Sequence, residues 1–182
     1  MSVTTKLFTA DDLAAMGDDS HYELIRGELR EKVPTKLRHG KVAGRFHTHL
    51  GVYSLTVLPG EVIHGETGYH LEDNPDSVVM PDVSFIRRDR MPADDALDSF
   101  ARVAPDVAVE VRSPSNTQRE IEVKIVIYLA AGVRLVLVAD PETKEIEAHL
   151  PDGSVRVYGV GEDLDGGDVL PGFRVPVAAF FD

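Results

Sequence analysis

The sequence contains no cysteine and no tryptophan among its 182 residues. The absence of cysteine excludes disulfide bonds and thiolate metal sites, and it fits a reducing compartment. No apolar run reaches the roughly 18 residues of a membrane-spanning helix, so we expect no membrane partner. The opening Met-Ser-Val-Thr-Thr-Lys lacks the apolar stretch of a secretory signal. We therefore expect a cytoplasmic protein.

Positive charge is scarce, and the net charge of −12 argues against a protein that coats nucleic acid over its whole surface. The charges are unevenly distributed, however. Residues 26–49 hold seven Lys or Arg and two Glu, whereas residues 140–182 hold ten acidic and three basic residues. The basic region 26–49 could therefore contact DNA while the acidic part keeps the protein soluble. Alternatively, its charges are ordinary solvated side chains.

Helix signals occur at three places. Thr9 is a suitable N-cap for a short helix. Apolar residues at helical spacing predict a second helix over residues 39–58. A third helix is expected over residues 117–131, because Thr117 and Glu120 fit a capping box, in which each side chain binds the other residue's free backbone N–H.

Strand signals occupy most of the remaining sequence. The predicted strands cover residues 22–25, 29–33, 61–71, 77–86, 105–111, 133–139, 145–150 and 154–158. The first two form a hairpin that turns at Gly27. The continuous apolar run 133–139 is typical of a strand buried on both faces. The tail, residues 169–175, is expected at the edge of the sheet.

This order of elements predicts a mixed α/β protein with a central mixed β-sheet flanked by helices. Its length and composition favour a single domain, residues 1–182. We expect an N-terminal helix and hairpin in 1–38, a core in 39–140 and a β-rich extension in 141–182. A homodimer is one possible assembly, because strands near the chain ends could pair across a two-fold axis.

Two acidic residues lie within predicted strands. Asp82 is a lone acid among strand-forming residues, and Glu110 lies in a segment of alternating valines. A buried carboxylate needs a partner or a metal. If the two strands pair with both acids on one face, their oxygens form a site for a hard cation such as Mg²⁺. Otherwise each acid forms a salt bridge, for example with Arg112 or Arg87, or faces solvent.

A lysine and several histidines could also carry chemistry. Lys124 lies in a predicted helix that is apolar on almost every side. It either extends to solvent or points at the two carboxylates and stabilises charge there. The histidines that could form an imidazole metal site in a cupin-like fold are His47, His49, His64 and His70. The first two are disfavoured, because residues two apart on a helix point in different directions.

No Walker loop, dinucleotide-binding glycine fingerprint or Gly-x-Ser-x-Gly motif is present. Residues 113–115, Ser-Pro-Ser, are expected to form a turn rather than to supply a nucleophile.

The spacing of the two acids resembles a known enzyme signature. Pro81-Asp82, followed by Glu110-Val111-Arg112, resembles the PD-(D/E)XK signature of restriction-endonuclease-like enzymes. From about Phe8 to Phe181, the chain is more specifically similar to the bacterial Uma-two family. The segments that carry this similarity are Tyr22-Glu23-Leu24-Ile25-Arg26-Gly27-Glu28, His39-Gly40, Pro81-Asp82-Val83-Ser84-Phe85, residues 105–115, Lys124 with residues 128–133, Asp140-Pro141 and Leu170-Pro171-Gly172-Phe173.

The resemblance implies a Mg²⁺-dependent endonuclease that cleaves DNA, with Mn²⁺ as a substitute ion, and with the metal at an edge of the sheet. Matched by position, Asp82 and Glu110 would bind the metal, and Asp82, Glu110 and Lys124 would be the catalytic residues. The position two residues after Glu110 holds Arg112 in place of lysine. We expect Lys124 to take over that role. Arg112 is a rival that could only stabilise charge, because arginine is nearly always protonated.

Two further acids match the family's opening motif. We expect Glu28 to hold the hairpin through cross-strand pairs, whereas Glu23 could serve either the hairpin or the site. The alternative function is a binding or assembly module that kept the nuclease fold and lost the chemistry. The negative net charge favours this alternative.

Overall fold

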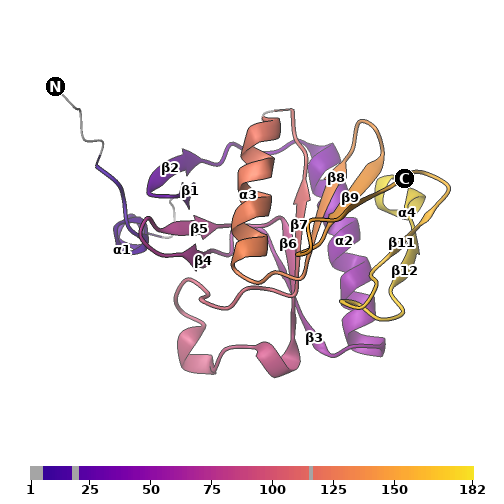
Figure 1. The fold of residues 1–182 in the computed structure, drawn as a ribbon, viewed down its shortest axis with the longest axis horizontal. Helices are drawn as coiled ribbons and strands as arrows, with labels where there is room; N and C mark the ends of the chain where they lie inside the picture. The colour runs from indigo at the N-terminus through magenta and orange to yellow at the C-terminus, as the bar shows by residue number, and fades with distance from the viewer. Residues whose placement is uncertain (1–5, 18–20, 115–116) are drawn as a thin grey trace.

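The computed structural model describes residues 6–17, 21–114 and 117–182, so the predicted roles of residues 1–5 and of Ser115 lie outside it. A six-stranded sheet forms the centre of the molecule (Figure 1). Its strands, in spatial order, are β10 (Val155–Tyr158), β9 (Glu145–His149), β8 (Leu135–Asp140), β7 (Val107–Val111), β6 (Val83–Arg87) and β3 (Gly60–His64). β7 and β8 are parallel and the other neighbours are antiparallel, so the sheet is mixed, as predicted.

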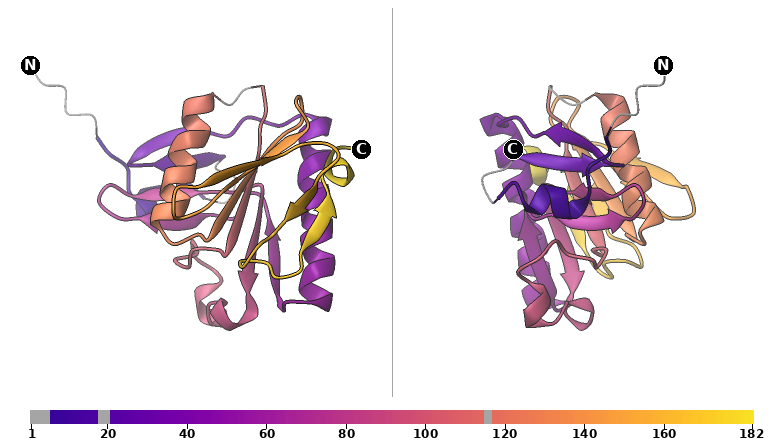
Figure 2. Two further views of the ribbon diagram at one scale, coloured as in Figure 1. Left: turned by 45° about the vertical axis from the view of Figure 1, so that its right-hand side comes forward. Right: turned by 90° about the vertical axis from the view of Figure 1, so that its left-hand side faces the viewer.

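Two helices cover opposite faces of this sheet (Figure 2). α2 (Leu37–Thr56) and α3 (Gln118–Ala130) were both predicted from the sequence, and α2 begins and ends two residues before its expected bounds. Thr117 and Glu120 form the expected capping box of α3. Two short 3-10 helices, η1 (Arg88–Arg90) and η2 (Asp94–Ala96), follow β6. None of the described helices has the length and apolar character needed to cross a membrane.

A smaller sheet of four strands lies beside the first. Its order is β2 (Glu28–Glu31), β1 (Tyr22–Ile25), β5 (Ser77–Val79) and β4 (Tyr69–Glu72). β1 and β2 form the predicted hairpin, and Gly27 adopts the positive φ of 80° that its turn requires. α1 (Ala10–Ala14) begins at Thr9, which forms a capping box with Asp12, and packs on this sheet through Leu13.

Two predicted strands are wrong as single elements. The segment 61–71 is divided into β3 and β4 by a turn at residues 65–68, and the segment 77–86 is divided into β5 and β6 at residues 80–82. In both cases the chain passes from one sheet to the other. The two crossings are adjacent, because the backbone N–H of Gly65 donates to the carbonyl of Asp82 at 2.9 Å.

Pro81 explains why the second of these strands is interrupted. Proline has no N–H to continue a strand ladder. The preceding N–H, from Met80, donates to the side chain of Glu23 at 2.6 Å instead of to a neighbouring strand. Asp82 therefore lies in the link between the sheets. The sequence-based expectation that it lies on a strand paired with that of Glu110 is wrong.

The prediction that residues 169–175 join the edge of the main sheet is also wrong. β12 (Arg174–Pro176) pairs with β11 (Asp163–Asp165) in a separate two-stranded sheet, and α4 (Ala178–Phe181) follows. This part of the chain lies beside α2 (Figure 1). The ring of Phe180 stacks on that of Phe46 in α2, with 4.3 Å between centroids. The tail therefore covers a helix and buries apolar side chains there, which stabilises the fold.

The packing of α2 predicts a contrast between two leucines on that helix. Leu50 is 0% exposed and Leu55 is 85% exposed. We expect Leu50→Ala to reduce the free energy of unfolding by about 2 to 5 kcal/mol, because it leaves a cavity in the core. Leu55→Ala should change it by less than about 0.5 kcal/mol. Urea unfolding followed by circular dichroism measures both, and equal losses would contradict this packing.

Candidate functional site

A buried ammonium group joins two carboxylates between α3 and the sheets. The Nζ atom of Lys124 lies 2.6 Å from Oε1 of Glu110 and 2.9 Å from Oε1 of Glu23, and the lysine side chain is only 11% exposed. In the view of Figure 1, α3 lies in front of the place where the two sheets meet. Lys124 on α3 can therefore reach both β7 and β1. Of the two orientations open to Lys124, the structure therefore has the one that points at the acids.

The alternation of β7 places Glu110 beneath α3. Val109 and Val111 belong to the core on the α2 side, so Glu110 faces the opposite helix. The hydroxyl of Tyr128, one turn after Lys124, donates to Oε1 of Glu110 at 2.6 Å. Glu110 is thus held by two side chains of a single helix.

Asp82 is anchored at the end of the same strand. Its Oδ2 atom accepts the backbone N–H of Val111 at 2.8 Å, and Nε2 of His39 lies 3.1 Å from the same oxygen. Val111 directly follows Glu110, so the structure brings the two predicted metal-binding acids to one place. Within the described residues, neither acid pairs with an arginine.

The electrostatics of this cluster differ from one group to the next. Burial, with the nearby charges of Asp82 and Glu23, raises the pKa of Glu110 to about 7, although Lys124 acts in the opposite direction. Burial would raise the pKa of Asp82, but His39, Lys124 and the N–H of Val111 hold it below its ordinary value. Burial would lower the pKa of Lys124, but Glu110 and Glu23 keep it above its ordinary value. Lys124 therefore stays protonated.

The cluster has the donor atoms and the charge that a divalent cation needs. Three carboxylates, from Asp82, Glu110 and Glu23, are balanced by the one ammonium of Lys124, which leaves excess negative charge. Oδ1 of Asp82 and Oε2 of Glu110 have no hydrogen-bond or ion-pair partner among the described residues. Two free carboxylate oxygens are suitable ligands for a hard cation such as Mg²⁺. The residues present thus fit the metal that the sequence suggested.

A cleft gives access to the cluster. Its volume is about 700 Å³, and Asp82, Glu110 and Lys124 all contribute to its lining. A second hollow of about 790 Å³ adjoins it and shares Asp82 and His39. Besides Lys124, the Lys and Arg side chains that line the first cleft are Arg26, Arg30, Lys32 and Arg119. Of the predicted basic region 26–49, only the part up to Lys32 supplies basic side chains to this lining.

The rival residue Arg112 forms no ion pair with Asp82, Glu110 or Glu23 among the described residues. Its guanidinium lies 3.1 Å from Oε1 of Glu147 and 3.9 Å from Oδ2 of Asp140, on the β8–β9 side. The position beside Glu110 is therefore filled by Lys124.

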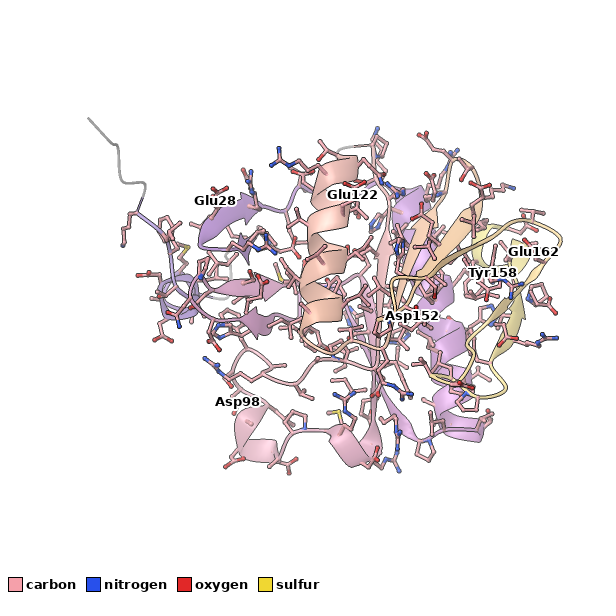
Figure 3. The ribbon with its side chains drawn as sticks, in the orientation of Figure 1. Glu28, Asp98, Glu122, Asp152, Tyr158 and Glu162 are labelled. Carbon is pink, nitrogen blue, oxygen red and sulfur yellow. The ribbon has the colours of Figure 1, made fainter. Side chains whose placement is uncertain are left out.

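The expected cross-strand pairs of Glu28 are not formed. Its carboxylate pairs at 2.6 Å with Arg30 of the same strand, and Figure 3 shows it on β2, away from α3.

The histidine site is wrong within the described residues, because its four members are not brought together. The ring of His47 faces that of His64 at 6.0 Å between centroids, whereas His49 packs on Phe180. His70 lies elsewhere, close to two aspartates. The mixed α/β fold also excludes the cupin-like architecture on which this site depended.

Comparison with known proteins places this chain in a family. A family model named Uma2 and described as "Putative restriction endonuclease" matches residues 9–178. The chain belongs to the Uma2 (Uma-two) family. No curated protein matches it. A solved structure titled as "a putative nuclease belonging to DUF820 from Anabaena variabilis" shares the fold of this Uma2 chain, with a TM-score of 0.83 and 16% identity over 96% of this chain and 97% of the other.

Three residues of the cluster received no definite role from the sequence of this Uma2 chain. The sequence leaves Glu23 open between the hairpin and the site, and it marks His39 and Tyr128 only as parts of the family resemblance. The structure shows that each contacts a predicted site residue: Glu23 contacts Lys124, His39 contacts Asp82 and Tyr128 contacts Glu110. Their presence in the resembling segments was the only signal, since no local pattern shows which way such side chains point.

The raised pKa of Glu110 predicts a pH-dependent stability in the metal-free protein. The unfolded chain loses this proton near 4.5, whereas the folded chain keeps it up to about 7. Because the folded state binds more protons in this interval, its stability falls as pH rises through it. In EDTA, the wild type should lose free energy of unfolding relative to Glu110→Gln as pH rises from 4.5 to about 7. Urea unfolding across this range tests the prediction, and a constant difference between the two proteins would contradict it.

Proposed function

We propose that this Uma2 protein is a Mg²⁺-dependent endonuclease that hydrolyses phosphodiester bonds of DNA. The observation that carries the proposal is the buried ammonium of Lys124 between Glu110 and Glu23, with Asp82 beside them at the cleft. A buried group of three acids and one lysine is costly to assemble for stability alone, since apolar residues would fill the same space without the desolvation penalty. The family description supports a nuclease.

Asp82 and Glu110 would hold the metal through their free oxygens. A bound Mg²⁺ supplies a polarised water as nucleophile and offsets charge on the phosphate. Mn²⁺ accepts the same carboxylate ligands and would replace it. The protein positions both acids in advance: the N–H of Val111 and His39 hold Asp82, and Tyr128 holds Glu110.

Lys124 would stabilise negative charge as the phosphate is attacked. Its pKa is above the ordinary value, so it carries its proton at neutral pH and cannot act as a base. A fixed positive charge in a buried site stabilises a developing anion more than the same charge does in water. Glu23 binds Lys124 from the side opposite Glu110 and would hold the ammonium in place.

The cleft would bind the DNA backbone. Phosphates attract the basic side chains that line it, whereas the acids at its floor repel them until a metal is bound. Tight DNA binding would therefore require the divalent ion. This requirement reconciles a nucleic-acid substrate with a chain whose net charge is −12.

The alternative is a nuclease-fold module for binding or assembly that has lost its chemistry, and the net charge favours it. Calorimetric titration with Mn²⁺ separates the two functions. The endonuclease binds the ion through Asp82 and Glu110, so the heat of binding that comes from this site should be lost in Glu110→Gln. A wild type that binds no Mn²⁺ at millimolar concentration would support the module.

The proposal predicts cleavage of plasmid DNA that requires Mg²⁺ or Mn²⁺. Asp82→Asn and Glu110→Gln should reduce the rate at least about 100-fold, and Lys124→Ala about 100- to 1,000-fold, because each removes a charge from the reacting centre. Gel assays with plasmid and with single-stranded DNA measure these rates. Circular dichroism of each variant checks that it is folded.

The matched control is Glu122→Gln, the same change on an exposed residue that Figure 3 labels on α3. It should cut at the wild-type rate. Arg112→Gln tests the rival residue, and it should retain far more activity than Lys124→Ala. If Glu110→Gln cut as fast as the wild type, the activity would come from a contaminant and the assignment would fail.

The basic lining of the cleft predicts a specific salt dependence of DNA binding. Arg119 lines the cleft, whereas Arg156 lies on the edge strand β10 outside both hollows. In a Lys124→Ala background, which keeps both metal ligands but cuts slowly, and with Mg²⁺ present, Arg119→Gln should weaken binding to a labelled duplex and lower the slope of log affinity against log salt by about one. Arg156→Gln should change neither quantity. Fluorescence anisotropy measures both, and equal effects would exclude this cleft as the binding surface.

A further inference from the structure

A second group of potential metal ligands lies in the turn between β4 and β5, apart from the cleft. His70, on strand β4, faces Asp73 and Asp76 of the turn that follows the strand. Its Nε2 atom lies 3.2 Å from Oδ1 of Asp73 and 3.7 Å from Oδ2 of Asp76, and the three ligand atoms lie within 4.8 Å of one another. The histidine side chain is 5% exposed.

Among the described residues, the imidazole nitrogen that faces these acids has no hydrogen-bond partner. Both carboxylate oxygens are near Nε2 of His70, but neither lies in hydrogen-bonding geometry to it, so the atom is buried and unsatisfied among the described residues. A buried polar atom without a partner costs free energy and is rare in folded proteins. A ligand at this position would remove that cost.

The spacing of the three atoms fits a small cation. Ligands about 2.1 Å from a tetrahedral zinc ion lie about 3.4 Å from each other. The two distances from Nε2, 3.2 and 3.7 Å, lie on either side of that value. Ligands around a cation also flank the direction of the nitrogen lone pair instead of lying on it, which agrees with two nearby oxygens that form no hydrogen bond to Nε2.

Backbone hydrogen bonds hold the carboxylate of Asp76 in place, whereas the carboxylate of Asp73 is exposed and can change its position. Asp76 is fixed, because Oδ2 accepts the N–H of Ala10 at 2.8 Å and Oδ1 accepts that of Asn74 at 3.3 Å. Asp73 is 61% exposed, and its Oδ1 atom lies 3.3 Å from the guanidinium of Arg102, whose side chain is 67% exposed. An exposed ion pair of this kind contributes little to stability, so a cation could displace Arg102.

We propose that His70, Asp73 and Asp76 form a binding site for Zn²⁺, separate from the proposed nuclease centre. An imidazole ligand favours zinc over Mg²⁺ or Ca²⁺, which prefer oxygen ligands only. Three protein ligands and a water are a common zinc environment. Because Asp76 also binds the first turn of α1, the ion fastens the β4–β5 turn to that helix and stabilises the N-terminal part of the fold.

The test is zinc binding to the full chain after chelation and removal of the chelator. Equilibrium dialysis with metal analysis should find one tightly held zinc ion per chain in the wild type, and the same ion in Asp82→Asn/Glu110→Gln, which lacks the nuclease ligands. Asp73→Asn should lower zinc affinity at least about tenfold, by analogy with the losses caused by altering metal-site partners. His70→Gln should do the same. Zinc should raise the Tm of the wild type but not of Asp73→Asn.

Two controls separate this site from incidental binding. Arg102→Gln breaks the same exposed ion pair as Asp73→Asn but keeps the ligands, so it should bind zinc as tightly as the wild type or more tightly. His149→Gln removes a histidine that pairs with a single acid, Glu147, at 2.9 Å, and it should have no effect. A wild type that retains no zinc, or an Asp73→Asn variant that binds zinc with unchanged affinity, would overturn the proposal.

Discussion

The ion cluster centred on Lys124 determines how the larger parts of this protein are placed relative to one another. Its members come from α3, from β7 of the main sheet and from β1 of the smaller sheet. Each charge is buried, and a buried charge without a partner is strongly destabilising. The helix and both sheets must therefore assemble with close tolerance, so that each buried charged group has its partner. These buried ion pairs therefore tell little about the stability of the protein, but they fix the relative positions of α3, β7 and β1.

The same constraint explains why the link at residues 80–82 lies beside the site. Glu23 accepts both the Lys124 ammonium and the N–H of Met80, so one carboxylate fixes the helix and also the point where the chain changes sheets. Asp82 follows directly and takes the N–H of Val111, which extends beyond the last pair between β6 and β7. Where the pairing of β6 and β7 stops, Asp82 thus replaces a strand as hydrogen-bond acceptor.

Much of this architecture could be predicted from local patterns. The helices, their caps at Thr9 and Thr117 and the hairpin at Gly27 depend on residues close in sequence, and each was confirmed. The strands 61–71 and 77–86 were wrong because their residues favour strands throughout, while the exchange of sheets depends on a distant carboxylate. Pro81 was the one local warning, since proline seldom occurs inside a central strand. The tail was misplaced because its apolar residues do not indicate which surface they cover.

The candidate site was partly accessible in the same way. A lone acid in a strand and a lysine in an apolar helix are conspicuous in sequence, which is why Asp82, Glu110 and Lys124 could be selected. The orientation of Arg112 could not be foreseen, because Glu147 reaches it from a strand that follows much later. The sequence groups His70 with the wrong partners for a related reason: its neighbours are acids of the turn that follows its strand, and only the fold shows that they face its ring.

The stacking of Phe180 on Phe46 has a consequence for the order of events during synthesis on the ribosome. α2 is made early, but part of its apolar surface is covered only by a segment translated near residue 180. Until then the nascent chain exposes that surface, where chaperones can bind or other chains can adhere. Ribosome-bound chains that stop before β12 should therefore be more prone to aggregation than their content of folded sheet would suggest.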